Sequence, residues 1–155
     1  MSQDAQPDLG IGMVGYAFMG AAHSQAWRNA PRFFDLPLAP RMQVVAGRNA
    51  ERAAQAADKL GWASSTTDWR ELLTRDDVQL IDICSPGDTH AEIAIAALEA
   101  GKHVLCEKPL ANTVEEAERM NAAAIAAEAR GVRAMVGFTY RRVPAIRLAQ
   151  QLVAD

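Results

Sequence analysis

A glycine-rich turn near the start of the chain has the residue types and the spacing that can hold a phosphate group. Gly15 permits a tight turn after an apolar run, and Gly20 lets the following helix approach that run closely. The first backbone N–H groups of a helix have no intrahelical acceptor, so they can bind an anion such as a pyrophosphate. We therefore predict that a dinucleotide cofactor contacts this turn, which consists of Gly15, Tyr16, Ala17, Phe18, Met19 and Gly20.

Two details of this region bear on the prediction. Ala17 stands where the usual pattern has its middle glycine, and its methyl group narrows the space for the phosphate. An overlapping stretch, residues 10–15, also satisfies the G-x-G-x-x-G pattern, but its glycines lie inside the expected first strand, where a phosphate cannot reach them. The later turn is therefore the predicted phosphate site.

The end of the second expected strand bears on which nicotinamide cofactor binds. An acidic residue there would bind the ribose 2′-hydroxyl of NAD and repel the 2′-phosphate of NADP. The sequence has Gly47, Arg48 and Asn49 instead, and Arg48 could pair with a phosphate or stack on adenine. This favours NADP slightly over NAD, the alternative being that Arg48 is a solvated residue and NAD still binds.

A second candidate site lies where the strand that starts at His103 ends in Glu107, Lys108 and Pro109. Ligands bind at the carboxyl ends of strands in parallel sheets, so Lys108 would lie beside the nicotinamide. Its ammonium could hydrogen-bond a substrate hydroxyl and help the proton leave as hydride is transferred, which makes Lys108 the predicted catalytic residue. Glu107 would hold that ammonium, and Pro109 would restrict the lysine backbone. An ordinary surface ion pair is the alternative.

Short β-type runs alternate with longer helical stretches, which predicts a parallel sheet. The apolar runs are nearly continuous, so both faces of the sheet must be covered by helices. We therefore expect an α/β fold, a doubly wound parallel sheet of the Rossmann type with about six strands. The expected strands are residues 9–14, 42–46, 78–84, 103–107 and 132–138, with a weaker one at 62–65.

Local signals predict where the helices begin and end. Thr89 with Glu92, and Thr113 with Glu116, have the spacing of capping boxes. The proline-containing segment 30–40 is expected to be an ordered loop, because proline interrupts helices. Three helices are expected to end at Gly61, Gly101 and Gly131.

Composition narrows the classes of partner. Sixteen basic and nineteen acidic residues give a net charge of -3, so no basic surface for nucleic acid is expected, and a small molecule is the better candidate. The chain has no apolar run long enough for a membrane span and no signal-peptide pattern, so a cytoplasmic protein without membrane contact is expected. Cys84 and Cys106 lack ligands at metal-site spacing, which predicts packed, reduced thiols and no metal.

From Leu9 to about Leu148, the chain resembles the glucose-fructose oxidoreductase and inositol dehydrogenase family, known as Gfo/Idh/MocA. Three groups of residues carry the resemblance, namely Met19, Gly20 and His23, then Ser85, Pro86 and His90, then Glu107, Lys108 and Pro109. The resemblance implies that Ser85 and Pro86 pack near the cofactor and that Lys108 assists proton transfer. It also implies that residues 138–142 border the nicotinamide pocket and that the substrate is a sugar, a polyol or a related hydroxy compound. Gly87 departs from the polar residue usual there.

The histidines are less decisive. His23 is expected to be a packed or solvent-facing helix residue rather than a cofactor contact. His90, in the first turn of its helix, could contact the ribose or lie at the surface. His103 is expected to be structural.

The resemblance also implies the domain organisation. Residues 1–8 are expected to be a disordered tail, residues 9–140 the nucleotide-binding domain, and residues 141–155 a helix leading to a substrate domain absent from this chain. That second domain would supply further catalytic residues, so the chain alone should bind cofactor but turn over weakly. A homo-oligomer is expected for the full-length form. Two other functions stay open, a non-catalytic NAD(P) sensor and an interaction module.

Overall fold

The computed structural model describes residues 6–154, which form one parallel sheet covered by helices. The strand order is β3-β2-β1-β4-β5-β6, and every neighbouring pair is parallel. The predicted doubly wound α/β fold is confirmed. The strands are β1 (Asp8–Val14), β2 (Ala39–Ala46), β3 (Ser64–Thr66), β4 (Leu80–Ile83), β5 (His103–Cys106) and β6 (Ala134–Val136).

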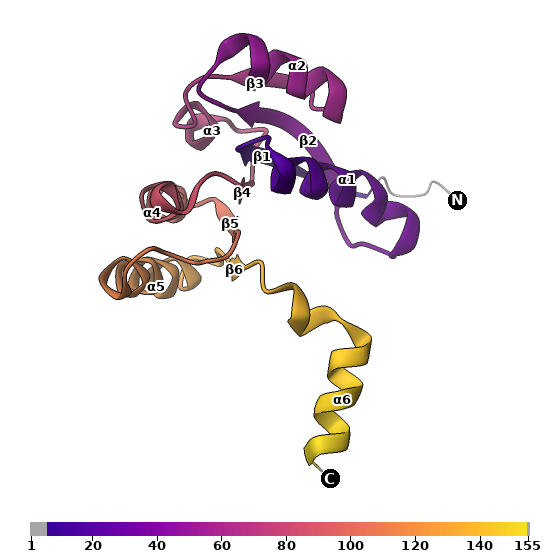
Figure 1. Ribbon diagram of the computed structural model, residues 1–155. Helices are drawn as coiled ribbons and strands as arrows, with labels where there is room; N and C mark the ends of the chain where they lie inside the picture. Colours follow the sequence, from indigo (N-terminus) through magenta and orange to yellow (C-terminus); the bar gives the residue numbers. More distant parts are fainter. Residues whose placement is uncertain (1–5, 155) are drawn as a thin grey trace.

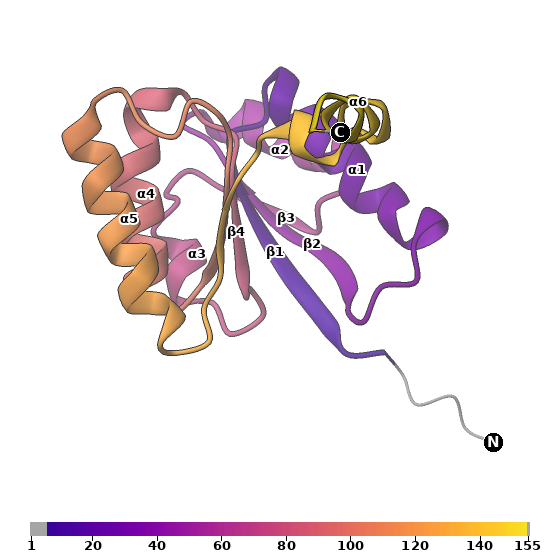
Figure 2. The same cartoon turned by 90° about the horizontal axis from the view of Figure 1, so that it is seen from below.

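Helices cover both faces of this sheet, as Figure 2 shows: α3, α4 and α5 lie on one side, and α1 and α2 lie on the other. Alternate residues of a strand point to opposite faces, so neighbouring Val44 and Val45 belong to separate apolar cores. The helices are α1 (Phe18–Phe33), α2 (Ala50–Leu60), α3 (Glu71–Thr74), α4 (His90–Glu99), α5 (Val114–Glu128) and α6 (Pro144–Ala154), with 3-10 helices η1 (Gly87–Thr89) and η2 (Thr139–Arg142).

Most of the predicted helix ends are confirmed. Gly61, Gly101 and Gly131 follow helices with φ of 81°, 78° and 80°, the left-handed conformation that glycine adopts without steric cost. At the start of α5, the Thr113 hydroxyl accepts from the Glu116 backbone N–H at 3.1 Å, and Glu116 completes the capping box.

The predicted capping box at Thr89 is wrong. The 3-10 helix η1 runs directly into α4, so Thr89 has helical rather than extended backbone angles, φ -103° and ψ -11°. Its hydroxyl donates to the Pro86 carbonyl oxygen at 2.7 Å instead. Glu92 forms an ion pair with Arg70.

Two predicted boundaries near the N-terminus also need correction. The segment 30–40 is not all loop, because α1 continues through Pro31 to Phe33 and β2 already begins at Ala39. A proline so close to a helix end removes a single backbone hydrogen bond, which the helix tolerates. Residues 1–5 of the predicted disordered tail lie outside the described residues. Pro7 and Asp8 are ordered, since the Pro7 carbonyl oxygen accepts from the Ala39 N–H at 2.8 Å and Asp8 begins β1.

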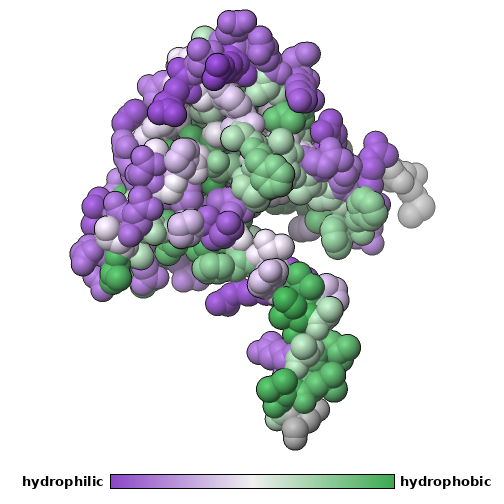
Figure 3. All heavy atoms as spheres, in the orientation of Figure 1, coloured by the Kyte–Doolittle hydropathy of each residue, from purple (hydrophilic) through white to green (hydrophobic). Residues whose placement is uncertain are grey.

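Helix α6 extends away from the sheet (Figure 1), and it contains no buried residue. Figure 3 shows that much of its surface is hydrophobic. Its exposed apolar side chains are Ile146, Leu148, Leu152 and Val153. Among residues 6–154, none of the helices combines the length and the apolar character needed to cross a membrane.

Candidate functional site

The predicted site residues follow the carboxyl ends of β1, β2, β4 and β5. In the sheet, β1 lies between β2 and β4. The chain runs from β1 outward through β2 to β3, and then returns to the other side of β1 to form β4, so the order of strands reverses at this point. The crevice outside such a switch point is where open α/β sheets bind ligands. The loops after these four strands therefore surround one candidate site.

The glycine turn after β1 has the shape that sequence reasoning predicts. Gly15 has a φ of +95°, and a Cβ atom there would lie 2.8 Å from backbone atoms of Cys84 and Ser85. A Cβ atom on Gly20 would lie 2.2 Å from the Gly15 carbonyl oxygen. Only glycine fits at either position, so the turn brings β1, β4 and α1 into close backbone contact.

The backbone N–H groups at the start of α1 have no side-chain cap among the described residues. Its N-cap, Ala17, makes no side-chain hydrogen bond, and its first turn contains no acidic residue. By contrast, Asn49 caps α2 by accepting from the Arg52 N–H at 2.9 Å, and Thr113 caps α5. The open N–H groups and the positive end of the α1 dipole fit a pyrophosphate.

Beyond β2, Tyr16 occupies the space beside Gly47. A Cβ atom on Gly47 would lie 1.9 Å from Cε1 of the Tyr16 ring, so a larger residue here would displace the tyrosine. Arg48 is exposed and makes no ion pair among residues 6–154. Its guanidinium is therefore free to contact a ligand.

After β5, Lys108 and Pro109 are exposed, while Glu107 is buried. Lys108 lines a surface hollow together with residues 137–140. The predicted pairing of Glu107 with the lysine ammonium is wrong: a Glu107 carboxylate oxygen accepts from the backbone N–H of Lys108 at 3.1 Å instead. The carboxylate thus bonds to the lysine backbone and not to its ammonium. The Lys108–Pro109 peptide bond is cis.

The carboxylate of Glu107 faces inward because it bonds to His23. The His23 ring lies between two acids, with Nδ1 2.9 Å from Asp82 Oδ1 and Nε2 3.1 Å from Glu107 Oε1. Asp82 is fully buried and also accepts from the Trp27 indole N–H at 2.7 Å. Burial of the ring lowers the pKa of His23, but the hydrogen bonds and charges of Asp82 and Glu107 outweigh burial, so this pKa is raised.

His90 is buried rather than at the surface, which corrects one of the two predicted roles. Its Nδ1 lies 2.9 Å from the Pro109 carbonyl oxygen, and its Nε2 lies 2.9 Å from that of Ser85. The ring therefore connects the turn after β4, which contains Pro86, to the turn after β5. A direct contact of His90 with a ribose stays a prediction, although both ring nitrogens are already within hydrogen-bonding distance of backbone oxygens.

The other predicted structural roles hold. His103 Nδ1 accepts from the Arg133 backbone N–H at 2.9 Å, away from the site. Cys84 and Cys106 are free and buried. Burial and the charges of Glu107 and Asp82 raise the pKa of Cys106 to about 12. Both thiols are therefore packed groups and poor nucleophiles.

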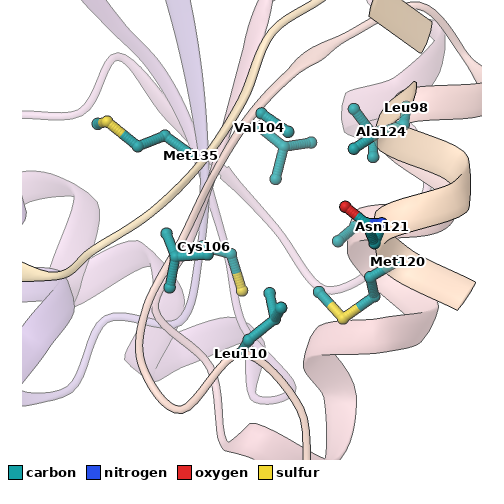
Figure 4. A pocket seen from close by; sticks show the side chains of 11 residues that line it. Leu98, Val104, Cys106, Leu110, Met120, Asn121, Ala124 and Met135 are labelled. Carbon is teal, nitrogen blue, oxygen red and sulfur yellow. The ribbon is translucent and has the colours of Figure 1, made fainter. Parts of the chain in front are cut away.

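A separate apolar pocket lies between α4, α5 and the strands β5 and β6 (Figure 4). Leu98, Met120 and Ala124 face Val104 and Cys106 across it, and Asn121 is the one amide in its lining. The lining contains no carboxylate, histidine, lysine or arginine, so this pocket lacks the charged groups that gather at the carboxyl ends of the strands.

Comparison with known proteins agrees with this geometry. Residues 9–138 match the model of an oxidoreductase family with an NAD-binding Rossmann fold, Gfo/Idh/MocA. The chain belongs to the Gfo/Idh/MocA family. The predicted resemblance is confirmed.

Three members of known sequence or structure show how similar the chain is to others of this family. A levoglucosan dehydrogenase from Pseudarthrobacter phenanthrenivorans is 45% identical over 149 residues, which are 96% of this chain and 37% of that protein. The crystal structure of an oxidoreductase domain protein from Kribbella flavida is 74% identical with a TM-score of 0.92, covering 96% of this chain and 40% of that one. A levoglucosan dehydrogenase solved with NADH and levoglucosan has a TM-score of 0.88 at 45% identity, covering 95% of this chain and 39% of that one. The chain thus spans about two fifths of these relatives' length.

Sequence reasoning missed Asp82 altogether and gave His23 little weight. A signal for Asp82 was present, because a carboxylate interrupts the apolar strand run 80–84, where a charge is costly unless it is paired. Nothing in the sequence identified its partner, since His23 lies 59 residues earlier in the chain.

Proposed function

We propose that the protein is an NAD(P)-dependent oxidoreductase that moves hydride between the nicotinamide and a carbon bearing a hydroxyl group. The substrate is a sugar, a polyol or a related hydroxy compound, as in the relative solved with levoglucosan. The observation that carries this proposal is that the uncapped α1 is joined to the Lys108 turn through His23 and Glu107, at the carboxyl end of the sheet. The nicotinamide would supply the hydride acceptor or donor.

In this proposal the protein's own residues bind, orient and handle the proton. The backbone around Gly15 and Gly20 holds the pyrophosphate through the N–H groups at the start of α1. The Lys108 ammonium hydrogen-bonds the substrate oxygen and lowers the cost of removing its proton. Phe138 and Tyr140, which line the same hollow as Lys108, form a wall of the nicotinamide pocket. Pro86 and Ser85 border the crevice from β4.

For the choice of cofactor, the proposal keeps a preference for NADP. No carboxylate follows β2 at residues 47–49, and the exposed Arg48 can meet a 2′-phosphate. The relative solved with NADH is 45% identical, so NAD is the competing choice. Titration with NADPH and NADH decides between them, because Arg48→Ala should weaken NADPH binding about tenfold or more and leave NADH binding nearly unchanged.

The exposed face of α6 supports a two-domain organisation. Residues 9–140 are the nucleotide-binding domain, and residues 141–155 connect to a substrate domain that packs on the apolar side chains of α6. The curated relative is longer than this chain, since the match covers 37% of it. Full-length copies would assemble as a homo-oligomer, and the free thiols fit the reducing cytoplasm.

The test of the proposal is nicotinamide fluorescence with the protein titrated against NADH and NADPH. We expect saturable binding, and Lys108→Ala should retain it within a few-fold because the lysine acts on the substrate oxygen. In the two-domain protein, the same substitution should reduce turnover of a polyol by about 10²-fold or more. The absence of binding for both cofactors would overturn the proposal.

A further inference from the structure

A chain of hydrogen bonds links the phosphate-binding helix to the turn that carries Lys108. It begins at His23, one turn into α1, and passes through Nε2 to Glu107 Oε1 at 3.1 Å. The other oxygen of Glu107 accepts from the Lys108 backbone N–H at 3.1 Å. On the opposite side of the ring, Asp82 of β4 accepts from Nδ1 at 2.9 Å. One imidazole therefore joins three elements of the proposed site.

The packing around this chain leaves little room for another arrangement. The side chains of His23, Asp82 and Glu107 are 17%, 0% and 7% exposed. A Cβ atom on Gly137 would lie 2.9 Å from Glu107 Oε1, so the backbone after β6 presses against this carboxylate. The indole N–H of Trp27 fixes the second oxygen of Asp82 at 2.7 Å. Both carboxylates are thus held in place on the two sides of the ring.

The number of protons on the His23 ring decides whether both carboxylates receive a hydrogen bond from it. An imidazolium donates one N–H to each carboxylate, whereas a neutral imidazole has one N–H and directs a lone pair at the other acid. A buried carboxylate that faces a lone pair loses its hydrogen bond and suffers repulsion. The titratable groups that face the ring are Asp82 in β4, Cys84 directly after that strand, and Glu107 directly after β5. The ring is the only cation in this set, and its pKa is raised.

We infer that His23 is a positioning residue, whose imidazolium fixes the phosphate-binding helix relative to the Lys108 turn by holding Asp82 and Glu107 together. This inference rests on the proposed function, because the role of the His23 bridge is to keep the pyrophosphate site and Lys108 at a constant separation. Loss of the ring proton releases one carboxylate. When Glu107 is released, the Lys108 backbone loses its acceptor and the lysine is no longer held at the hollow.

The direction of the pH dependence follows from the raised pKa. The folded protein binds the His23 proton more tightly than the unfolded chain, in which the pKa returns to its ordinary value of 6.5. The stabilisation by the bridge is therefore complete below that value and is lost as pH rises through the pKa of the folded state. The bridge is therefore strongest on the acid side of the raised pKa and weakens as pH rises through it.

The direct test is a ¹⁵N NMR titration of the three histidine rings in the 155-residue protein. At about pH 6.5, we expect most His23 rings to carry a proton on both nitrogens, with a midpoint above that of an ordinary histidine. Glu107→Gln and Asp82→Asn should each lower the midpoint, while His103→Gln, the matched control, should leave it unchanged. A His23 ring that is neutral at about pH 6.5 in the wild-type protein would overturn the inference without any variant.

A second measurement separates positioning from general stability. Amide hydrogen exchange at Lys108 should accelerate about tenfold or more in His23→Gln, because Glu107 no longer holds that N–H. The Val104 N–H, which bonds to the Arg133 carbonyl oxygen at the other end of β5, should exchange as in the wild type. Equal acceleration at both amides would show a merely structural histidine and sink the inference.

Neither measurement requires a cofactor, so the two proposals can fail separately. If wild-type protein shows the cationic ring but binds neither NADH nor NADPH, the proposed function fails and the bridge stands. If the cofactor binds and the ring is neutral, the bridge fails alone.

Discussion

Replacement of Asp82 should be among the most damaging single changes in the chain, although this residue lies below the surface of the crevice. Its carboxylate is 0% exposed and accepts from His23 and from the Trp27 indole. In Asp82→Ala both donors lose their acceptor in a buried place, and His23 keeps only Glu107. Breaking a buried ion pair from one side costs about 3–5 kcal/mol.

The isosteric change gives the matched comparison. Asp82→Asn keeps the volume and one oxygen acceptor, so either the indole or the imidazole can still be satisfied. The expected loss is about 1–3 kcal/mol, the cost of one unsatisfied buried group. For a chain of this size, 1 kcal/mol shifts the melting temperature by about 2–4 °C, so the alanine variant should melt about 6–20 °C lower.

Urea unfolding followed by circular dichroism measures both losses, with the slope of the transition checked for constancy. Adding His23→Gln to Asp82→Asn should cost less than the sum of the single changes, because the two residues share one interaction. A loss below about 1 kcal/mol for Asp82→Ala would refute the reasoning, since it would mean that the buried carboxylate satisfies no donor.

Two further predictions concern local backbone geometry. Gly15→Ala should abolish cofactor binding, because its Cβ atom would lie 2.8 Å from backbone atoms in a turn with positive φ. Gly101→Ala is the control, because Gly101 also has positive φ but its Cβ atom would have nothing within 4 Å. The control variant should bind NADH normally in the same fluorescence titration. Thr113→Ala should lower the free energy of unfolding by about 1 kcal/mol through loss of the cap. Thr89→Ala should cost less, because its hydroxyl caps no helix, and an equal loss in urea unfolding would contradict the assigned difference.

Much of the fold could be predicted from the sequence because its signals are local. The helix-ending glycines Gly61, Gly101 and Gly131 and the Thr113 cap act within a few residues of themselves. The apolar runs were long enough to show that strands alternate with helices along the chain. The predicted boundaries were wrong mainly around Pro31, where a helix tolerates a proline near its end.

Pairing by adjacency failed at Glu107 and Lys108. Neighbouring residues of an extended segment point in opposite directions, so Glu107 faces the interior and Lys108 faces solvent. The spacing of a capping box led to Thr89 being paired with Glu92, whereas the turn after β4 holds the threonine in a helical conformation.

By itself the sequence determined the class of fold, the frame of the glycine turn and the position of the lysine at a strand end. These depend on steric and hydrophobic rules that operate over short stretches of chain. Only the tertiary structure decided which acids bond to the His23 ring, because Asp82 and Glu107 lie 59 and 84 residues away and meet the ring only when α1 packs across the ends of β4 and β5. Hydrogen bonds between distant residues depend on that packing, and no local pattern encodes it.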